Sequence, residues 1–293
     1  MPETTLLEEK KLPPALEKAM ADVGEIASLP EITTKIVQVV EDPRATAHDM
    51  HEIVRSDPAL AAKILRVVNS AFYGLPSQIA SLDRAILMLG LSAVKNIALA
   101  ASLSRMFNAE AVSAHFAVRD LWRHCVAVGV CSRMLGQVGT PAPTDEPFVG
   151  GLVHDVGLLA VQQLFPEKLK QVIEECYNTP QNFLAVEQSI IGADHEAFGG
   201  SLAAKWKFPP ALRCAIMCHH EPGVMPPEFQ KVAMTVCVAD RVCCQGRYGL
   251  WLTAQTEEIT EDMLDAIGVT PANLQDIAEH LPEAVEEAEQ VFA

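Results

Sequence analysis

Aromatic residues are scarce in this chain. Only three Trp and three Tyr occur among 293 residues, and aromatic residues make up 5% of the total. Hydrophobic residues still reach 49% against 20% charged, so global disorder is excluded and a large core is available. That core must be mainly aliphatic, and a chain of this length can form one large domain or two small ones.

Basic residues are also few. The chain has 22 Lys and Arg against 38 Asp and Glu, which gives a formal net charge of −16. Such a field repels phosphate backbones and anionic membrane surfaces. We therefore expect neither a nucleic acid nor a membrane as partner, and we expect the acidity mainly to keep the protein soluble.

Signals for export and for disulfides are missing. Residues 1–11 contain no apolar signal region, and no uncharged apolar run reaches 18 residues. The eight cysteines form no Cys-x-x-Cys pair, and most lie in apolar helical runs as small core residues would. We expect a cytoplasmic, reduced protein without disulfides.

Strand-like alternation and internal repeats do not occur, whereas helical periodicity runs through almost the whole chain. The pattern therefore predicts an all-α protein. Pro30, for example, should begin a helix that runs to about Glu41. In the second half, helices are predicted over residues 112–135, 148–165, 166–178, 181–190, 194–206, 210–219 and 229–244.

The texture of the sequence predicts three parts. Residues 1–108 form an N-terminal part with short helices, and residues 109–250 form a second helical bundle. Residues 251–293 form an acidic helical tail, because residues 255–293 hold eight Glu and three Asp but no Lys or Arg. Such a charge run is typical of a solvated cover.

The candidate chemistry lies in the second part, where five of the nine histidines stand on or at the ends of predicted helices. His154 and Asp155 are adjacent in an apolar run, and a buried charged pair is costly unless a bound metal or a similar partner compensates it. Asp120 precedes His124 by four residues, so both project from one helix face. The candidate metal ligands are Asp120, His124, His154, Asp155, His195, His219, His220 and Asp240.

These eight residues come from five helical segments and are enough for two divalent ions, with an open position for water or phosphate. Adjacent residues on one helix cannot share a face. The members of each pair, His154–Asp155 and His219–His220, should therefore bridge two ions or bind separate ions, or one member should contact a ligand residue without binding the metal itself. In a catalytic centre, Asp155 would bridge the metals, and His219 or His220 would steer a phosphate.

Three other interpretations remain open at this point. The histidines could be buried in neutral hydrogen bonds, with an Asp as a helix cap. Cys214 and Cys218 could bind zinc with His219, although a second cysteine pair is missing. Cys218 and His219 could also form a nucleophile pair, although neighbours on a helix point apart.

The order His, His-Asp, His, His-His and Asp in the second half resembles the HD superfamily of metal-dependent phosphohydrolases. Residues 20–245 as a whole resemble its regulatory branch, the HDOD family. The phrases that carry this resemblance are Leu29-Pro30 and residues 53–60, 65–74, 79–86 and 200–209, together with His219-His220.

The resemblance implies an N-terminal helical half packed on an HD-like helical bundle. It implies a bacterial regulatory protein that acts in signalling with a protein partner, with a nucleotide or phosphate as a further ligand. It also implies a site for one or two divalent ions of iron, manganese or zinc. The alternative is an active metal-dependent phosphohydrolase acting on a nucleotide or phosphodiester.

Two departures argue against the cyclic di-GMP hydrolysis of the related HD-GYP enzymes. The lysine that follows His-Asp-x-Gly in those enzymes is Leu158 here, and no Gly-Tyr-Pro signature follows His219-His220-Glu221. Arg241 is the nearest candidate to replace the lysine, and Asp120 matches the acidic residue four before the first His. Residues 69–74 could form a partner surface, or could tie helices together with Asn69 as a helix C-cap.

Overall fold

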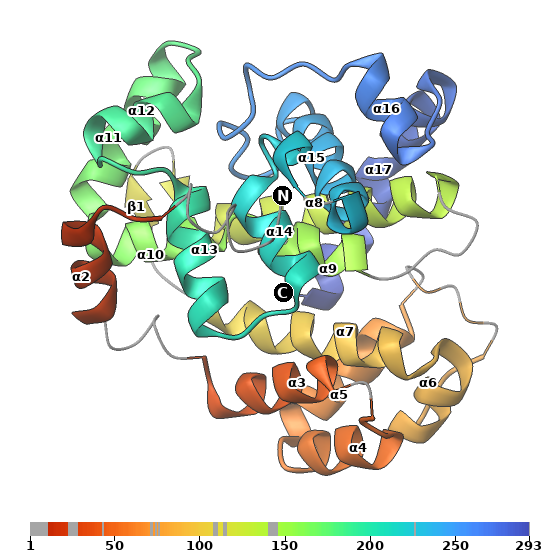
Figure 1. Cartoon of the computed structure of the whole chain (residues 1–293). Helices are drawn as coiled ribbons and strands as arrows, with labels where there is room; N and C mark the ends of the chain where they lie inside the picture. The colour runs from red at the N-terminus through yellow and green to blue at the C-terminus, as the bar shows by residue number, and fades with distance from the viewer. Residues whose placement is uncertain are drawn as a thin grey trace.

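The structure is a computed structural model that describes residues 11–22, 29–42, 44–70, 73, 75, 77–107, 111–113, 116–139, 146–225 and 227–292. Helices dominate these residues, so the predicted all-α class is confirmed (Figure 1). A small exception is the antiparallel pair β1 (Ala111–Ser113) and β2 (Phe116–Ala117). The predicted helix start at residue 112 is therefore wrong, and helix α8 begins at Val118.

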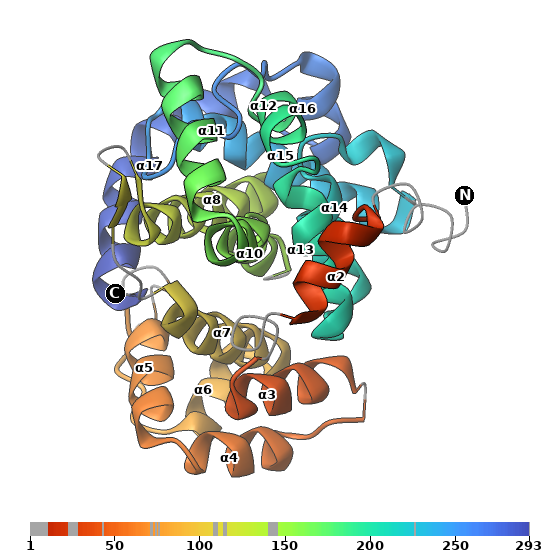
Figure 2. The same ribbon diagram turned by 90° about the vertical axis from the view of Figure 1, so that its left-hand side faces the viewer.

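Apart from α2, which lies beside the upper body, the first group of helices builds the lower body in Figures 1 and 2. Sequence signals start several of them: the Asp57 side chain accepts a hydrogen bond from the Leu60 backbone N–H, and Thr46 forms a capping box with Asp49. The elements are α2 (Pro14–Asp22), α3 (Glu31–Glu41), α4 (Ala47–Arg55), α5 (Pro58–Val68), α6 (Leu82–Leu89), α7 (Leu91–Leu103) and the 3-10 helix η1 (Ser104–Phe107).

The second group carries the candidate site. Helices α8, α9, α14 and α15 pack against one another in its centre, and α10 packs against α13. The elements are α8 (Val118–Gly139), α9 (Glu146–Val153), α10 (Val156–Leu164), α11 (Pro166–Asn178), α12 (Phe183–Ile190), α13 (His195–Lys205), α14 (Pro210–Cys218), η2 (Pro222–Val224), α15 (Pro227–Gln245), α16 (Glu261–Ile267) and α17 (Pro271–Phe292).

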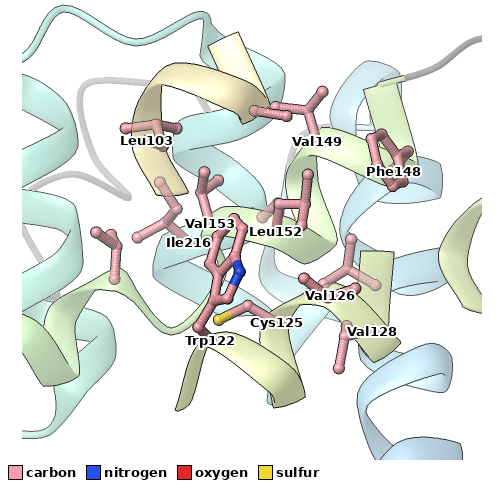
Figure 3. Packing of buried hydrophobic residues seen from close by; sticks show 14 of the residues in the cluster. Leu103, Trp122, Cys125, Val126, Val128, Phe148, Val149, Leu152, Val153 and Ile216 are labelled. Atoms are coloured by element: carbon pink, nitrogen blue, oxygen red, sulfur yellow. The ribbon is translucent and has the colours of Figure 1, made fainter. Parts of the chain in front are cut away.

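Helix α7 joins the two groups, because it contacts α3, α5 and α6 on one side and α9 on the other (Figure 2). The core around this junction is mainly aliphatic, as the composition predicts. Figure 3 shows Trp122 and Cys125 of α8 gathered with Leu152 and Val153 of α9 and with Ile216 of α14. The buried faces of these helices thus form one continuous core.

Close backbone contact brings α9 onto α8. A Cβ atom on Gly151 would lie 2.7 Å from the Gly129 Cα, so only glycine allows the two helices to approach this far. The rings of His124 on α8 and His154 after α9 consequently lie with their centroids 5.3 Å apart.

The helix predicted over residues 148–165 is interrupted in the structure. Helix α9 ends at Val153, His154 and Asp155 form a turn, and α10 begins at Val156. The His-Asp pair therefore lies at a junction between two helices and not inside one helix.

Within the acidic tail, residues 261–267 and 271–292 are helical whereas residues 251–260 are not, and α17 is also part of the core. Helix α17 packs along α8 through Ile277, Leu281, Val285 and Ala288, which are at most 3% exposed. Most of its acidic residues lie on the other face, whereas Glu289 lies at the edge of the contact with α8 and pairs with Arg123 at 2.9 Å. The apolar positions every three or four residues explain this amphipathic packing.

The segment after α5 ties two parts of the first group together. The Asn69 side chain donates to the Leu65 and Ile79 carbonyl oxygens at 2.8 Å each, and accepts from the Ile79 N–H. This contact favours the tying role of Asn69 as C-cap of α5. Residues 71, 72 and 74 of the predicted partner surface lie outside the described residues.

Two further predictions concern the whole chain. All eight cysteines lie among the described residues, where they are buried and form no disulfide. No helix among the described residues combines the length and apolar character that crossing a membrane requires. The division into residues 1–108, 109–250 and 251–293 stays a prediction.

Candidate metal centre

Seven of the eight predicted ligands come together in one buried cluster. His124 comes from α8, His195 is the first residue of α13, and Asp240 comes from α15. His154 and Asp155 occupy the α9–α10 junction, and His219 and His220 follow α14. Six of the seven are at most 1% exposed, and the His220 side chain is 5% exposed.

The junction explains how two adjacent residues reach one site. His154 Nε2 lies 3.3 Å from Asp155 Oδ2, while Asp155 Oδ1 lies 3.2 Å from His195 Nε2 and 3.5 Å from His219 Nε2. His154 and Asp155 lie in a turn and not in one continuous helix, so both can face the same cluster. His219 and His220 likewise leave α14 before their rings turn inward.

The outer ring nitrogens are all held by acceptors. Three Nδ1 atoms meet backbone carbonyl oxygens, from His124 to Tyr248 at 3.1 Å, from His154 to Gly151 at 2.7 Å and from His219 to Ala215 at 3.1 Å. A carbonyl can only accept, so these Nδ1 atoms carry the proton and the Nε2 atoms of the neutral rings present lone pairs inward.

The inward ring nitrogens and the Asp155 carboxylate oxygens face one another, and too few protons are present for each of them to form a hydrogen bond. His195 Nε2 lies 3.3 Å from His219 Nε2 and 3.2 Å from His220 Nε2. His154 Nε2 and both carboxylate oxygens of Asp155 are buried without a hydrogen-bond partner, although imidazole nitrogens lie close to them. Orphaned buried acceptors are costly, and a divalent cation among imidazole and carboxylate donors removes that cost. The donor set therefore fits a metal.

The ligand atoms can be divided into two sets that Asp155 connects, and His219 of one set also lies within 4.8 Å of His154 and Asp240 of the other. His195, His219 and His220 form one group within 4.8 Å of one another, and His124, His154 and Asp155 form a second. Asp240 joins the second set, because its Oδ1 lies 2.9 Å from His124 Nε2 and 3.8 Å from His154 Nε2. Asp155 extends one oxygen towards each set.

The cluster perturbs the acidity of its own members. Burial acts to raise the pKa of Asp155, but His154 and His195 outweigh it and hold the pKa well below its usual range. Burial would lower the pKa of His195, yet Glu187 and Asp155 raise it well above the ordinary value. Burial, and then the neighbouring His219, lower the pKa of His220 well below its ordinary value. The pKa values of His195 and His220 are thus shifted in opposite directions within one cluster.

Asp120 does not join the cluster. Its carboxylate accepts a hydrogen bond from the Ala117 backbone N–H at 3.2 Å, in the first turn of α8. The first N–H groups of a helix have no partner within the helix, and a nearby carboxylate satisfies them. Asp120 therefore caps the start of α8, and its position does not support a role as a metal ligand.

The structure does not favour the cysteine alternatives. Cys214 and Cys218 pack in an apolar cluster with Met217 and Met225. His219 Nε2 points instead towards Asp155. Neither zinc binding by these cysteines nor a Cys218–His219 nucleophile fits this arrangement.

Sequence reasoning missed several residues that surround the ligands. Glu187 and Glu257 accept hydrogen bonds from His195 and His220, and the Cys244 thiol donates to Asp240 Oδ1 at 3.4 Å. Glu187 carried a signal, because it lies four residues from both Phe183 and Ile191, on a face that should be buried. Glu257 lies in a loop without periodicity and carried none.

Arg241 has a different role from the one the sequence suggested. Its guanidinium pairs with Glu257 at 2.8 Å and donates to the His220 carbonyl oxygen at 3.2 Å. It also donates to the Glu258 carbonyl oxygen. Arg241 therefore braces the loop behind His220, where it neutralises a carboxylate, and it is not poised to hold a substrate phosphate.

A family model of the HDOD domain matches residues 26–222. The chain belongs to the HDOD family. The match includes six of the seven clustered residues and ends before Asp240.

Solved structures share this HDOD fold. An HDOD domain protein of unknown function from Geobacter sulfurreducens has a TM-score of 0.77 at 21% identity, covering 98% of this chain and 96% of its own. A Marinobacter aquaeolei protein, provisionally named for signal transduction, has a TM-score of 0.75 at 20% identity, covering 98% and 65%. A Shewanella amazonensis protein, provisionally named a metal-dependent phosphohydrolase, has a TM-score of 0.64 at 20% identity, covering 99% of both chains.

A curated relative is also similar in sequence. An uncharacterized protein of Treponema pallidum is 25% identical over 229 residues, which are 77% of this chain. The chain spans 44% of the length of that relative.

Proposed function

We propose that this protein is a bacterial HDOD regulator that acts in signal transduction through a protein partner, with a metal-binding cluster as a structural and regulatory centre. The observation that carries the metal is the buried meeting of three Nε2 atoms and an orphaned Asp155 carboxylate. The Marinobacter aquaeolei structure, provisionally named for signal transduction, supports the signalling context. The three-part division of the chain belongs to the same proposal.

The cluster would hold two divalent ions. His195, His219 and His220 would bind one, and His124, His154 and Asp240 the other, with Asp155 shared between them. Imidazole and carboxylate donors suit iron, manganese or zinc. Asp120, which caps α8, is left out of this proposed set.

Burial and charge favour regulation over turnover. Leu158 is fully buried in the core, at the position where HD-GYP enzymes carry a phosphate-holding lysine. The Arg241 guanidinium is engaged by Glu257 and a backbone carbonyl. A phosphate ligand would therefore meet a buried metal cluster, and neither Leu158 nor Arg241 would offer it a cation.

The second candidate is a metal-dependent phosphohydrolase acting on a nucleotide or phosphodiester. The donor set favours it, as do the Shewanella amazonensis neighbours that are provisionally named phosphohydrolases. Bound divalent ions lower the pKa of water and supply hydroxide near neutral pH. Asp155 would hold the two ions together, and His219 and His220 would help to position the phosphate of the substrate.

An activity assay separates the two candidates. Protein purified without chelator and supplied with Mn²⁺ is incubated with bis(4-nitrophenyl) phosphate and, separately, with cyclic di-GMP. The regulatory proposal predicts bound metal without turnover of either compound. Turnover that disappears in His154→Ala together with the metal would instead establish the phosphohydrolase.

A further inference from the structure

The two sets of histidines differ in the groups that lie next to their Nδ1 atoms. His124 and His154 rest on backbone carbonyl oxygens. In the other set, the Nδ1 atoms of His195 and His220 lie in hydrogen-bond contact with Glu187 at 2.7 Å and Glu257 at 2.8 Å. The Nδ1 of His219 lies 3.1 Å from the Ala215 carbonyl oxygen, and the Glu196 carboxylate lies 3.6 Å from it, which is ion-pair distance and not a hydrogen bond.

These glutamates are built into the structure. Glu187 and Glu196 are fully buried, and the Glu257 side chain is 13% exposed. Glu187 Oε2 also accepts from the His195 backbone N–H at 3.0 Å, and Glu196 Oε1 accepts from the His220 N–H at 3.0 Å. The second oxygen of Glu257 pairs with Arg241. Each carboxylate is thus fixed by a contact besides its imidazole.

The charges around the imidazoles are strongly negative. If all five carboxylates are counted as ionised and the rings as neutral, Asp155, Asp240 and the three glutamates carry, together with Arg241, a formal charge of −4. Two divalent cations would balance that charge. Buried carboxylates without compensation destabilise a fold, so the cations have a structural reason to bind.

The negative charge is divided unequally between the two sets. Behind His195, His219 and His220 stand three glutamates, partly offset by Arg241. The other set has one carboxylate of its own, Asp240, whose Oδ1 also accepts a hydrogen bond from the Cys244 thiol. A carboxylate behind a ligating histidine fixes the ring and raises its basicity, and losing it typically weakens metal binding about 10–100-fold.

We infer that Glu187, Glu196 and Glu257 are positioning residues that make the His195–His219–His220 subsite the tighter of the two metal subsites. This subsite fills first, and the subsite of His124, His154 and Asp240 fills second. The inference rests on the proposed two-metal centre.

Calorimetric titration of metal-free protein with Mn²⁺ tests this order. Mn²⁺ is the weakest binder of the divalent first-row series, so both steps should be measurable. Glu187→Gln keeps the size of the side chain and an oxygen that can accept from His195, but removes the charge. We expect the first step to weaken about 10–100-fold with a smaller effect on the second. Glu257→Gln, at the least buried of the three glutamates, should act in the same direction.

Two further variants complete the test. Asp240→Asn should remove the second step and leave the first. Glu289→Gln is the matched control, because Glu289 pairs with Arg123 on the helix that carries His124, and it should titrate as the wild type does. Loss of the first step in Asp240→Asn, or glutamate variants that weaken only the second, would overturn the inference. A wild-type protein that takes up no Mn²⁺ would overturn the proposed metal centre itself.

Discussion

Gly157→Ala should push helices α10 and α13 apart and thereby displace a residue of the metal cluster. Gly157 stands in α10 where that helix touches α13, and a Cβ there would lie 1.9 Å from the His195 carbonyl oxygen and 2.6 Å from the Gly199 nitrogen. Both are backbone atoms, so no side-chain rotation can relieve the overlap. Real Cβ atoms essentially never approach within 3.0 Å, so the helices must separate by about 1 Å.

That separation moves a ligand. His195 is the first residue of α13, and its Nε2 lies 3.2 Å from Asp155 Oδ1. Overpacking of this kind costs about 1–3 kcal/mol. Each kcal/mol lowers the melting temperature of a domain of 150–250 residues by about 2–4 °C. Displacing the ligand should also weaken metal binding by about tenfold or more.

Thermal unfolding and metal retention after gel filtration measure both effects. Gly136→Ala is the matched control, because its Cβ within α8 would meet only Pro147 Cγ at 3.6 Å. Alanine inside a helix should stabilise the protein by about 0.5–1 kcal/mol. A Gly157→Ala protein that melts and retains metal like the wild type would refute the reasoning.

Three other predictions follow from the same geometry. Asp155→Asn should release both ions, because this carboxylate reaches both sets of histidines, and metal analysis that still finds two ions would contradict its shared role. Mn²⁺ uptake should release protons and weaken as pH falls, because Glu187 and Asp155 outweigh burial and raise the pKa of His195 well above its usual value. Calorimetric titration in buffers of different ionisation enthalpy counts the released protons. In the metal-free protein that raised pKa contributes stability below the unfolded pKa of histidine, and the contribution is lost as pH rises through the folded value, so the metal should stabilise most at high pH. The eight buried thiols should not react with a disulfide reagent until the protein unfolds, and fast labelling of any of them would contradict their burial.

Most ligands were recognisable from sequence because their setting is physically costly. His154, Asp155 and Asp240 stand in apolar runs, where an ionisable side chain requires a partner. Combining them with the other histidines predicted one site, and the structure brings seven of the eight residues together. Single-residue chemistry was therefore informative about the site before its geometry was known.

The break at His154 could not be read from the sequence. No proline lies at the junction, and apolar residues continue on both sides of the pair. The turn depends on contacts between distant segments, including the approach of α10 to α13 at Gly157. Helical periodicity reports which residues are buried, but it does not report where tertiary packing interrupts a helix.

Asp120 and the glutamates show two ways in which the spacing of residues along the sequence fails to predict a site. Asp120 shares a helix face with His124, yet its carboxylate accepts a hydrogen bond from the Ala117 N–H directly before α8. Glu196 precedes the apolar pair Ala197-Phe198 and Glu257 lies in a polar loop, and only the fold places them near His219 and His220. The outer contacts of a metal centre are thus harder to predict than its ligands.

The central claim is that the buried cluster holds two divalent ions. Elemental analysis of protein purified without chelator, compared with His154→Ala, tests it most directly. We expect two ions for each wild-type chain and fewer than two in the variant, because His154 Nε2 is one of the inward donors. A folded wild-type protein without bound metal, even after incubation with Mn²⁺, Fe²⁺ or Zn²⁺, would contradict the claim.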